Sequence, residues 1–328
     1  MGAIDIEGKQ YFSNNKYFAD AFNYLLYDGR QVIKPDELTE IDTTELTIPY
    51  GDKDVRVPVQ KYRDLLKVWN AMMDDAAIYV ILGAEIQDKV HYGMPVKDGL
   101  YDMLGYSKQI TEIKRKNREK FKSNDADKDE EGEITVQDGV LKIKLTSEEF
   151  LSGLCKGDKL KPIITVVLYL GEDSWDGPRS LFDLLDVKDE ILYQFLSDYK
   201  LNLISPVDMA DEEFEKFSTD LGKAMKLLKH LNTDEIGALQ VLGNGMIDRE
   251  TGIFLSQVTN LNIEFEEKGD KVNMSTSVDN IMKKIRISEA IEIYREYGES
   301  DEIIIDKIMK KFDVARDYVV ALLAPQKV

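Results

Sequence analysis

Two neighbouring segments of this 328-residue chain carry the clearest pattern of apolar and polar positions. In the segment AAIYVILGAEIQ (76–87) both alternating sets of positions are apolar or small from Ile78 to Ala84, which is typical of a strand buried on both faces. The preceding segment, YRDLLKVWNAMM (62–73), is ambiguous. Its large apolar residues fit a helical stripe as well as a strand.

If residues 62–72 form a strand, Asp74 and Asp75 can be the two-residue turn of a β-hairpin. The pairing that follows sets Asp64 directly opposite Glu85, with their β-carbons roughly 5 Å apart. Gln87 lies two residues beyond Glu85 and therefore points to the same face. Two facing carboxylates are suitable ligands for Mg²⁺ or Mn²⁺. The alternative is a pair of solvated acids, although a Glu at the end of a buried strand costs free energy unless it is paired or metal-bound.

Helical periodicity marks the segments on either side of this pair. Residues 14–28 predict a helix that buries Phe18 and Phe22, and residues 94–121 predict a long helix that begins near Pro95. We expect the buried side of the long helix to carry Val96, Leu100, Met103 and Ile110, with Asp98, Asp102, Gly105 and Gln109 on a different stripe. The basic residues between Lys114 and Lys122 suit either the negative end of the helix dipole or contact with phosphate.

The rest of the chain predicts an α/β fold, a mixed central sheet flanked by helices. Residues 161–185 indicate a buried strand, a loop and a short helix, and residues 211–231 a further helix. We expect one domain over residues 1–235, interrupted by an acidic loop at 123–133, and a mostly helical C-terminal extension over 236–328. The end of that extension reads as two short helices around Asp313. These two helices could form a small helix-turn-helix or an arm through which two chains form a homodimer. The third alternative is that they pack against the rest of the chain.

Composition narrows the classes of function. One cysteine and two histidines exclude an internal disulfide and make a zinc site built on these residues untenable, so carboxylates must hold any metal ion. No apolar run is long enough to span a membrane, and MGAIDIEGK at the start lacks the apolar core of a signal peptide, so we expect a cytoplasmic protein that does not bind membranes. The net charge of −19 argues against non-specific affinity for nucleic acid.

Several segments, in the same order, resemble the Rpn family of bacterial recombination-promoting nucleases, which are also described as transposases. This family belongs to the PD-(D/E)XK nuclease superfamily. The resemblance covers roughly residues 10–235, and the segments that carry it are FADAFNYLLYDGRQVI, YRDLLK, ILGAEIQDKVHYGMPVKDGLYDMLGYSKQI and KPIITVVLYLGEDSWDGPRSLFDLL. It implies a restriction-endonuclease-like fold and favours a strand at residues 62–72.

The resemblance also implies roles for individual residues. Asp64 matches the metal-binding Asp of the family, Glu85 matches the acid of its Glu-x-Gln element, and Gln87 stands where the superfamily usually has Lys. Asp20 lies where the first helix often adds an accessory acid. Lys97 stands where relatives commonly have Arg. On the helix motif YDxxxYxxQ, the resemblance sets the following residues near the substrate groove: Tyr101, Asp102, Tyr106 and Gln109.

The function that these inferences predict is hydrolysis of DNA phosphodiester bonds by an endonuclease that depends on Mg²⁺ or Mn²⁺, associated with recombination or mobile elements. Gln87 can be neither a general acid or base nor a cation, so Lys89 or Lys97 would have to supply the missing positive charge and contact substrate, together with Tyr101 and Gln109. The alternatives are a catalytically inactive DNA-binding or regulatory protein on a nuclease scaffold, and a protein-interaction module built on the helical tail.

Overall fold

The computed structural model describes most of the chain and divides it into two compact units. One unit holds residues 1–31, 170–174 and 205–328, and the other holds residues 32–169 and 175–204. The domain boundary that we expect near residue 235 stays a prediction. The described residues are 3–41, 44–47, 59–62, 64–73, 76–124, 136–137, 140–141, 146–231, 234–243, 245–259, 261, 263, 265 and 269–323.

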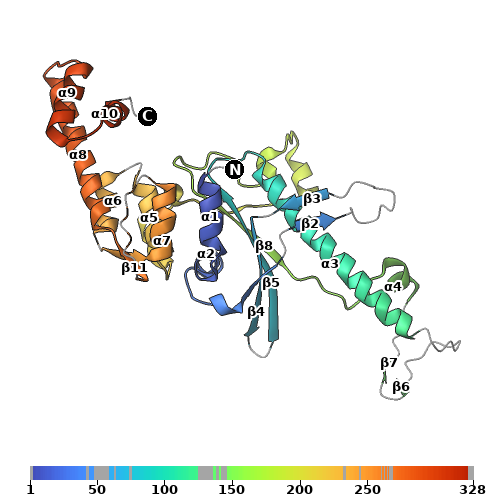
Figure 1. Ribbon diagram of the computed structural model, residues 1–328. Coiled ribbons are helices and arrows are strands. Elements are labelled where there is room, and N and C mark those ends of the chain that lie inside the picture. Colours follow the sequence, from blue (N-terminus) through green and yellow to red (C-terminus); the bar gives the residue numbers. More distant parts are fainter. Residues whose placement is uncertain are drawn as a thin grey trace. The chain divides into compact units, whose positions relative to one another are not determined.

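A five-stranded mixed sheet forms the centre of the unit that contains residues 32–169 (Figure 1). Its strands, in spatial order, are β1 (Leu38–Glu40), β4 (Leu65–Met73), β5 (Ala76–Gln87), β8 (Ile163–Tyr169) and β9 (Asn202–Ile204). The pairs β1·β4 and β4·β5 are antiparallel, whereas β5·β8 and β8·β9 are parallel. A mixed sheet with flanking helices confirms the predicted α/β class.

The β4–β5 hairpin has the predicted register. Leu65 pairs with Ala84 at one end and Met73 with Ala76 at the other. This pairing confirms that residues 65–73 are a strand and not a helix. Asp74 and Asp75, which we expect to form the turn, lie outside the described residues.

Helix α3 (Met94–Asn124) connects β5 to β8, as two parallel strands require a crossover (Figure 1). The predicted orientation of this helix is wrong. Val96, Leu100 and Met103 are 53%, 41% and 58% exposed, whereas Asp98 and Asp102 are buried. The polar stripe faces inward because its side chains form hydrogen bonds with the neighbouring strand. A buried polar group that has a hydrogen-bond partner lowers the free energy of unfolding only slightly.

Those partners form a regular ladder along β8 and the residues that lead into it. Asp102 accepts a hydrogen bond from the Thr165 hydroxyl at 2.8 Å, and the Tyr106 hydroxyl accepts one from the Ile163 N–H at 3.1 Å. Gln109 accepts from the Lys161 N–H at 2.8 Å and donates to the Lys161 carbonyl at 3.1 Å. Successive turns of the helix thus engage every second residue of the strand, which fixes the helix in register.

Shorter elements complete this unit. They are the hairpin β2 (Thr44–Thr47) and β3 (Val59–Tyr62), the hairpin β6 (Val136–Gln137) and β7 (Val140–Leu141), helix α4 (Ser147–Ser152), and the 3₁₀ segments η1 (Pro35–Glu37), η2 (Phe182–Leu184) and η3 (Glu190–Phe195).

The other unit is mainly helical. Tyr11 stacks on Tyr17 and on Phe254, with ring centroids 4.1 and 4.5 Å apart, and these contacts join its first two helices to α7. Its elements are α1 (Ala3–Ser13), α2 (Asn15–Tyr27), η4 (Pro206–Asp208), η5 (Asp211–Lys216), α5 (Leu221–Leu231), α6 (Glu235–Leu242), β10 (Met246–Asp248), α7 (Arg249–Val258), β11 (Lys271–Asn273), α8 (Ser275–Glu296), α9 (Asp301–Phe312) and α10 (Arg316–Leu323).

Two predicted helical regions have different outcomes in this unit. The helix expected at 211–231 is wrong in its first half, where a 3₁₀ segment precedes α5. The helical tail is confirmed, with α9 ending at Asp313 in a left-handed conformation (φ 50°). Helices α8, α9 and α10 share an apolar core of Ile287, Ala290, Ile291, Ile304, Ile305, Ile308, Val319 and Leu323.

Within the described residues, no helix combines the length and the apolar character needed to cross a membrane.

Candidate functional site

Asp64 directly precedes β4, and Glu85 lies near the end of β5. The β4–β5 pairing ends at Leu65 and Ala84, the residues that adjoin Asp64 and Glu85. The Asp64 carboxylate accepts a hydrogen bond from the Ile86 N–H at 2.9 Å, which holds it beside this part of β5. The Glu85 side chain is only 1% exposed. The register of the hairpin is the predicted one, and the direct pairing of Asp64 with Glu85 stays a prediction.

Lys97, in the first turn of α3, is an ion-pair partner of Glu85. Its ammonium nitrogen lies 2.9 Å from Glu85 Oε2 and 5.7 Å from the centre of the Tyr101 ring. Burial lowers the pKa of Lys97, but the Glu85 carboxylate, with smaller effects from Tyr101 and Asp64, outweighs burial and raises it overall. The ammonium is therefore charged at neutral pH and lies against the Glu85 carboxylate.

The other two polar residues on this strand segment are placed differently. Gln87 is half-buried, and its side-chain amide donates to the carbonyl of Ile86 at 2.8 Å. Lys89 is exposed in the bend that follows β5. Of the two lysines proposed to supply positive charge, Lys97 is the one in direct contact with Glu85.

Helix α3 holds Lys97 in place through the buried side chains of its polar face. The Asp102 carboxylate accepts hydrogen bonds from the hydroxyls of Tyr199 and Thr165. The Tyr199 ring packs beside Gly99, where a β-carbon would lie 3.3 Å from the ring. Sequence reasoning missed Tyr199, because no spacing pattern links residues 97 positions apart. The side chain of Gln109 is engaged with the backbone of Lys161, and Tyr101 is 7% exposed. Their predicted contact with substrate stays a prediction.

Asp20 belongs to the other unit, on α2. Its two oxygens accept hydrogen bonds from the N–H and the hydroxyl of both Ser218 and Thr219, at 2.6–3.0 Å, and a longer one from the side-chain amide of Gln31, at 3.4 Å. This carboxylate therefore fixes the backbone that leads into α5. Its predicted role as an accessory acid stays a prediction.

The chemistry of the Asp64–Glu85 pair fits a hard divalent cation. Mg²⁺ often binds proteins through one or two carboxylates and keeps several waters, so two acidic side chains suffice. A carboxylate offers about four lone-pair positions, and one hydrogen bond from Ile86 leaves Asp64 able to bind a cation. In the part of the chain that the structure describes, no group of three or more His, Cys, Asp or Glu side chains has the geometry of a metal site.

In a comparison with protein families, one described as "Putative transposase, YhgA-like" matches residues 147–251, which include α4, β8 and α5. This match confirms the resemblance that the sequence shows to that group, over a segment that excludes Asp64 and Glu85. Neither the curated proteins nor the solved structures gave a match.

Proposed function

We propose that this chain is a metal-dependent DNA endonuclease with Asp64 and Glu85 as its metal ligands. The observation that supports the proposal is a pair of acids at one end of the β4–β5 hairpin. The Asp64 carboxylate accepts a hydrogen bond from the N–H of Ile86, the residue after Glu85, and Glu85 is buried beside a lysine ammonium. Burying a carboxylate such as that of Glu85 costs free energy unless a cation compensates its charge. Buried carboxylates with a nearby cation are common at functional sites. The family match supports DNA as the substrate, since transposases act on DNA.

The residues would divide the chemistry among them. A bound Mg²⁺ or Mn²⁺ supplies an acidified water and neutralises charge on the phosphate. Asp64 and Glu85 hold the ion through their oxygens. Lys97 provides, from α3, the positive charge that the superfamily usually takes from Lys at the position of Gln87. Gln87 has no titratable proton at neutral pH and can only orient a water or a phosphate oxygen by hydrogen bonding.

A second function, DNA binding without hydrolysis, is favoured by two contacts at the same site. The Lys97 ammonium already compensates the charge of Glu85 at 2.9 Å, and the amide of Gln87 is directed to its own strand. In that case the ammonium replaces the metal ion, and the sheet serves as a scaffold for DNA recognition.

Cleavage of supercoiled plasmid in Mg²⁺ or Mn²⁺ tests the proposal. We expect Asp64→Asn and Glu85→Gln each to lower the cleavage rate by roughly 10²-fold or more, because each removes a charged metal ligand. Asp186→Asn and Glu112→Gln, at exposed acids of the same unit, are matched controls and should cleave at the wild-type rate. Circular dichroism checks that all four variants are folded.

Metal binding is measured separately by thermal denaturation. We expect Mn²⁺ to raise the Tm of the wild type and of both controls but not that of Asp64→Asn, because an ion that binds only the folded state stabilises it. Cleavage that is unchanged in Asp64→Asn and Glu85→Gln would exclude these residues as the catalytic centre. DNA binding by the wild type without any cleavage would establish the second function instead.

A further inference from the structure

A cavity of about 410 Å³ lies within the unit that contains the N-terminal and C-terminal segments, remote in sequence from Asp64 and Glu85. Its volume is within the range of small-molecule sites, roughly 300–1,000 Å³. Residues from α2, the η5–α5 region, the β10–α7 junction and β11 line it: Lys16, Phe214, Glu215, Phe217, Ser218, Thr219, Asp220, Gly222, Lys223, Lys226, Asp248 and Lys271.

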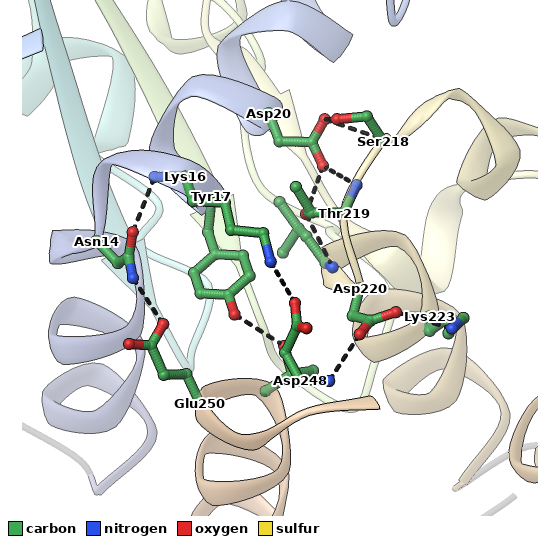
Figure 2. Close-up of polar contacts among 12 residues, drawn as sticks. Asn14, Lys16, Tyr17, Asp20, Ser218, Thr219, Asp220, Lys223, Asp248 and Glu250 are labelled. Carbon is green, nitrogen blue, oxygen red and sulfur yellow. Dashed lines mark hydrogen bonds and ion pairs between the residues drawn. The ribbon is translucent and has the colours of Figure 1, made fainter. Parts of the chain in front are cut away.

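Four lysines from three elements surround this cavity. Lys16 pairs with Asp248, and Lys223 lies 2.8 Å from Asp220 (Figure 2). Lys226 is held loosely, with its ammonium nitrogen 3.6 Å from Asp211 and 4.0 Å from Glu215. An ammonium has three N–H donors, so one carboxylate partner leaves donors for a ligand.

Two of the three acidic residues that line the cavity, Asp220 and Asp248, have a structural role. Asp220 accepts a hydrogen bond from the Asp248 N–H at 2.7 Å, and Asp248 precedes α7 directly. Asn14 caps α2 and donates to Glu250 at 2.6 Å, and these contacts bring the start of α2 against the start of α7 (Figure 2). The acids thus join the ends of helices and orient the lysines.

The residues that line the cavity carry a small excess of positive charge. They include four lysines and three carboxylates, Glu215, Asp220 and Asp248, and Lys226 is also near the Asp211 carboxylate outside the lining. The helices α2, α5 and α7 also begin at it, and each helix start contributes roughly half a positive charge. This balance contrasts with the net charge of −19 on the whole chain.

We propose that this cavity binds a phosphate group, carried by a nucleotide or by a DNA strand. Lysine ammonium groups are common ligands of phosphate, and the starts of helices favour anions. Asp20 shapes one wall, because its hydrogen bonds fix Ser218 and Thr219 (Figure 2). Gly222 shapes another wall of the cavity. A β-carbon at this position would lie 2.5 Å from the Phe214 carbonyl oxygen, so a side chain there does not fit without a shift. The site is separate from the proposed metal site and does not depend on it.

Binding of phosphate, adenosine monophosphate and a fluorescent DNA oligonucleotide tests the proposal, measured by calorimetry and fluorescence anisotropy in EDTA. We expect the double variant Lys226→Gln, Lys271→Gln to weaken binding roughly tenfold or more, because two charge-assisted contacts are lost. The matched control is Lys283→Gln, Lys310→Gln, which removes the same charge from exposed positions on α8 and α9. The control should change affinity by less than about twofold at 0.15 M salt, where distant surface charges are screened.

Competition identifies the source of the phosphate. DNA that displaces the mononucleotide assigns the cavity to a polynucleotide, and a nucleotide that stays bound in excess DNA assigns it to a free ligand. Equal weakening in the two double variants, or no measurable binding of any of the three probes, would overturn the proposal. Repeating the measurement with Asp64→Asn separates this result from the proposed nuclease, because phosphate binding should be unchanged in that variant.

Discussion

At the scale of single residues, the buried Glu85 carboxylate is the strongest constraint on the candidate site. Removing a carboxylate from water is costly, and the Lys97 ammonium at 2.9 Å compensates part of that cost. A divalent ion at Asp64 and Glu85 would offer the same compensation. The lysine and the ion therefore compete for Glu85 or share it.

This competition predicts the behaviour of Lys97→Gln. We expect the substitution to lower the free energy of unfolding by about 1–3 kcal/mol without metal, because Glu85 loses an ion-pair partner. Mn²⁺ should then raise the Tm of the variant more than that of the wild type, since the ion replaces the missing charge. Thermal denaturation with and without Mn²⁺ measures both effects. Equal shifts in the two proteins would show that Lys97 and the ion act independently.

A second ionic cluster predicts a dependence on pH. Hydrogen bonding from Lys229 is the largest effect on Asp211 and, together with His230, lowers its pKa to about 2. The pKa of this carboxyl is thus lower in the folded chain than in the unfolded chain, where it is about 3.9. Asp211 therefore contributes stability above about pH 4, and this contribution is lost as the pH falls towards 2.

Urea denaturation of the wild type and of Asp211→Asn measures that contribution. We expect the wild type to be the more stable protein at pH 6 and the difference to shrink steadily below pH 4. Because Asp211 is partly exposed, the difference should also decrease in high salt. A difference that is constant from pH 6 to pH 2.5 would contradict this account.

At the scale of elements, hydrogen bonding overrides the apolar pattern of α3. The stripe of Val96, Leu100 and Met103 predicted the wrong buried face, because Asp102, Tyr106 and Gln109 find their partners on and beside β8. The consequence for the site is direct. Docking the polar face turns Lys97 towards Glu85.

The start of α5 depends in a similar way on one carboxylate, that of Asp20. We expect Asp20→Ala to lower the free energy of unfolding by about 2–4 kcal/mol, because it leaves the N–H groups of Ser218 and Thr219 without their acceptor. Hydrogen exchange should accelerate at residues 218–222 while the amides of β5 stay protected. Loss of DNA cleavage with no change in stability would instead support the predicted role as an accessory acid.

At the scale of the whole molecule, the three C-terminal helices have an apolar core of their own, with Ile304 fully buried in it. We expect Ile304→Ala to cost about 2–5 kcal/mol, the usual penalty for a buried Ile. Hydrogen exchange should show that the loss of protection is confined to α8, α9 and α10. The exposed Ile303→Ala is the matched control and should have little effect. Loss of protection in β4 and β5 as well would show that the helices and the sheet unfold as one unit.

The sequence by itself determined the β4–β5 hairpin and its register, since alternation in a strand and the length of a turn are local properties. It also determined the helical tail and the α/β class. The tertiary structure alone decided which face of α3 is buried, that Tyr199 supports it, and that Lys67 is fully buried in β4, where burial lowers its pKa. It also decided that Lys16, Lys223, Lys226 and Lys271 surround one cavity. These features depend on partners far apart in the chain, and the free energy of a buried polar group is set by those partners and not by its neighbours in sequence.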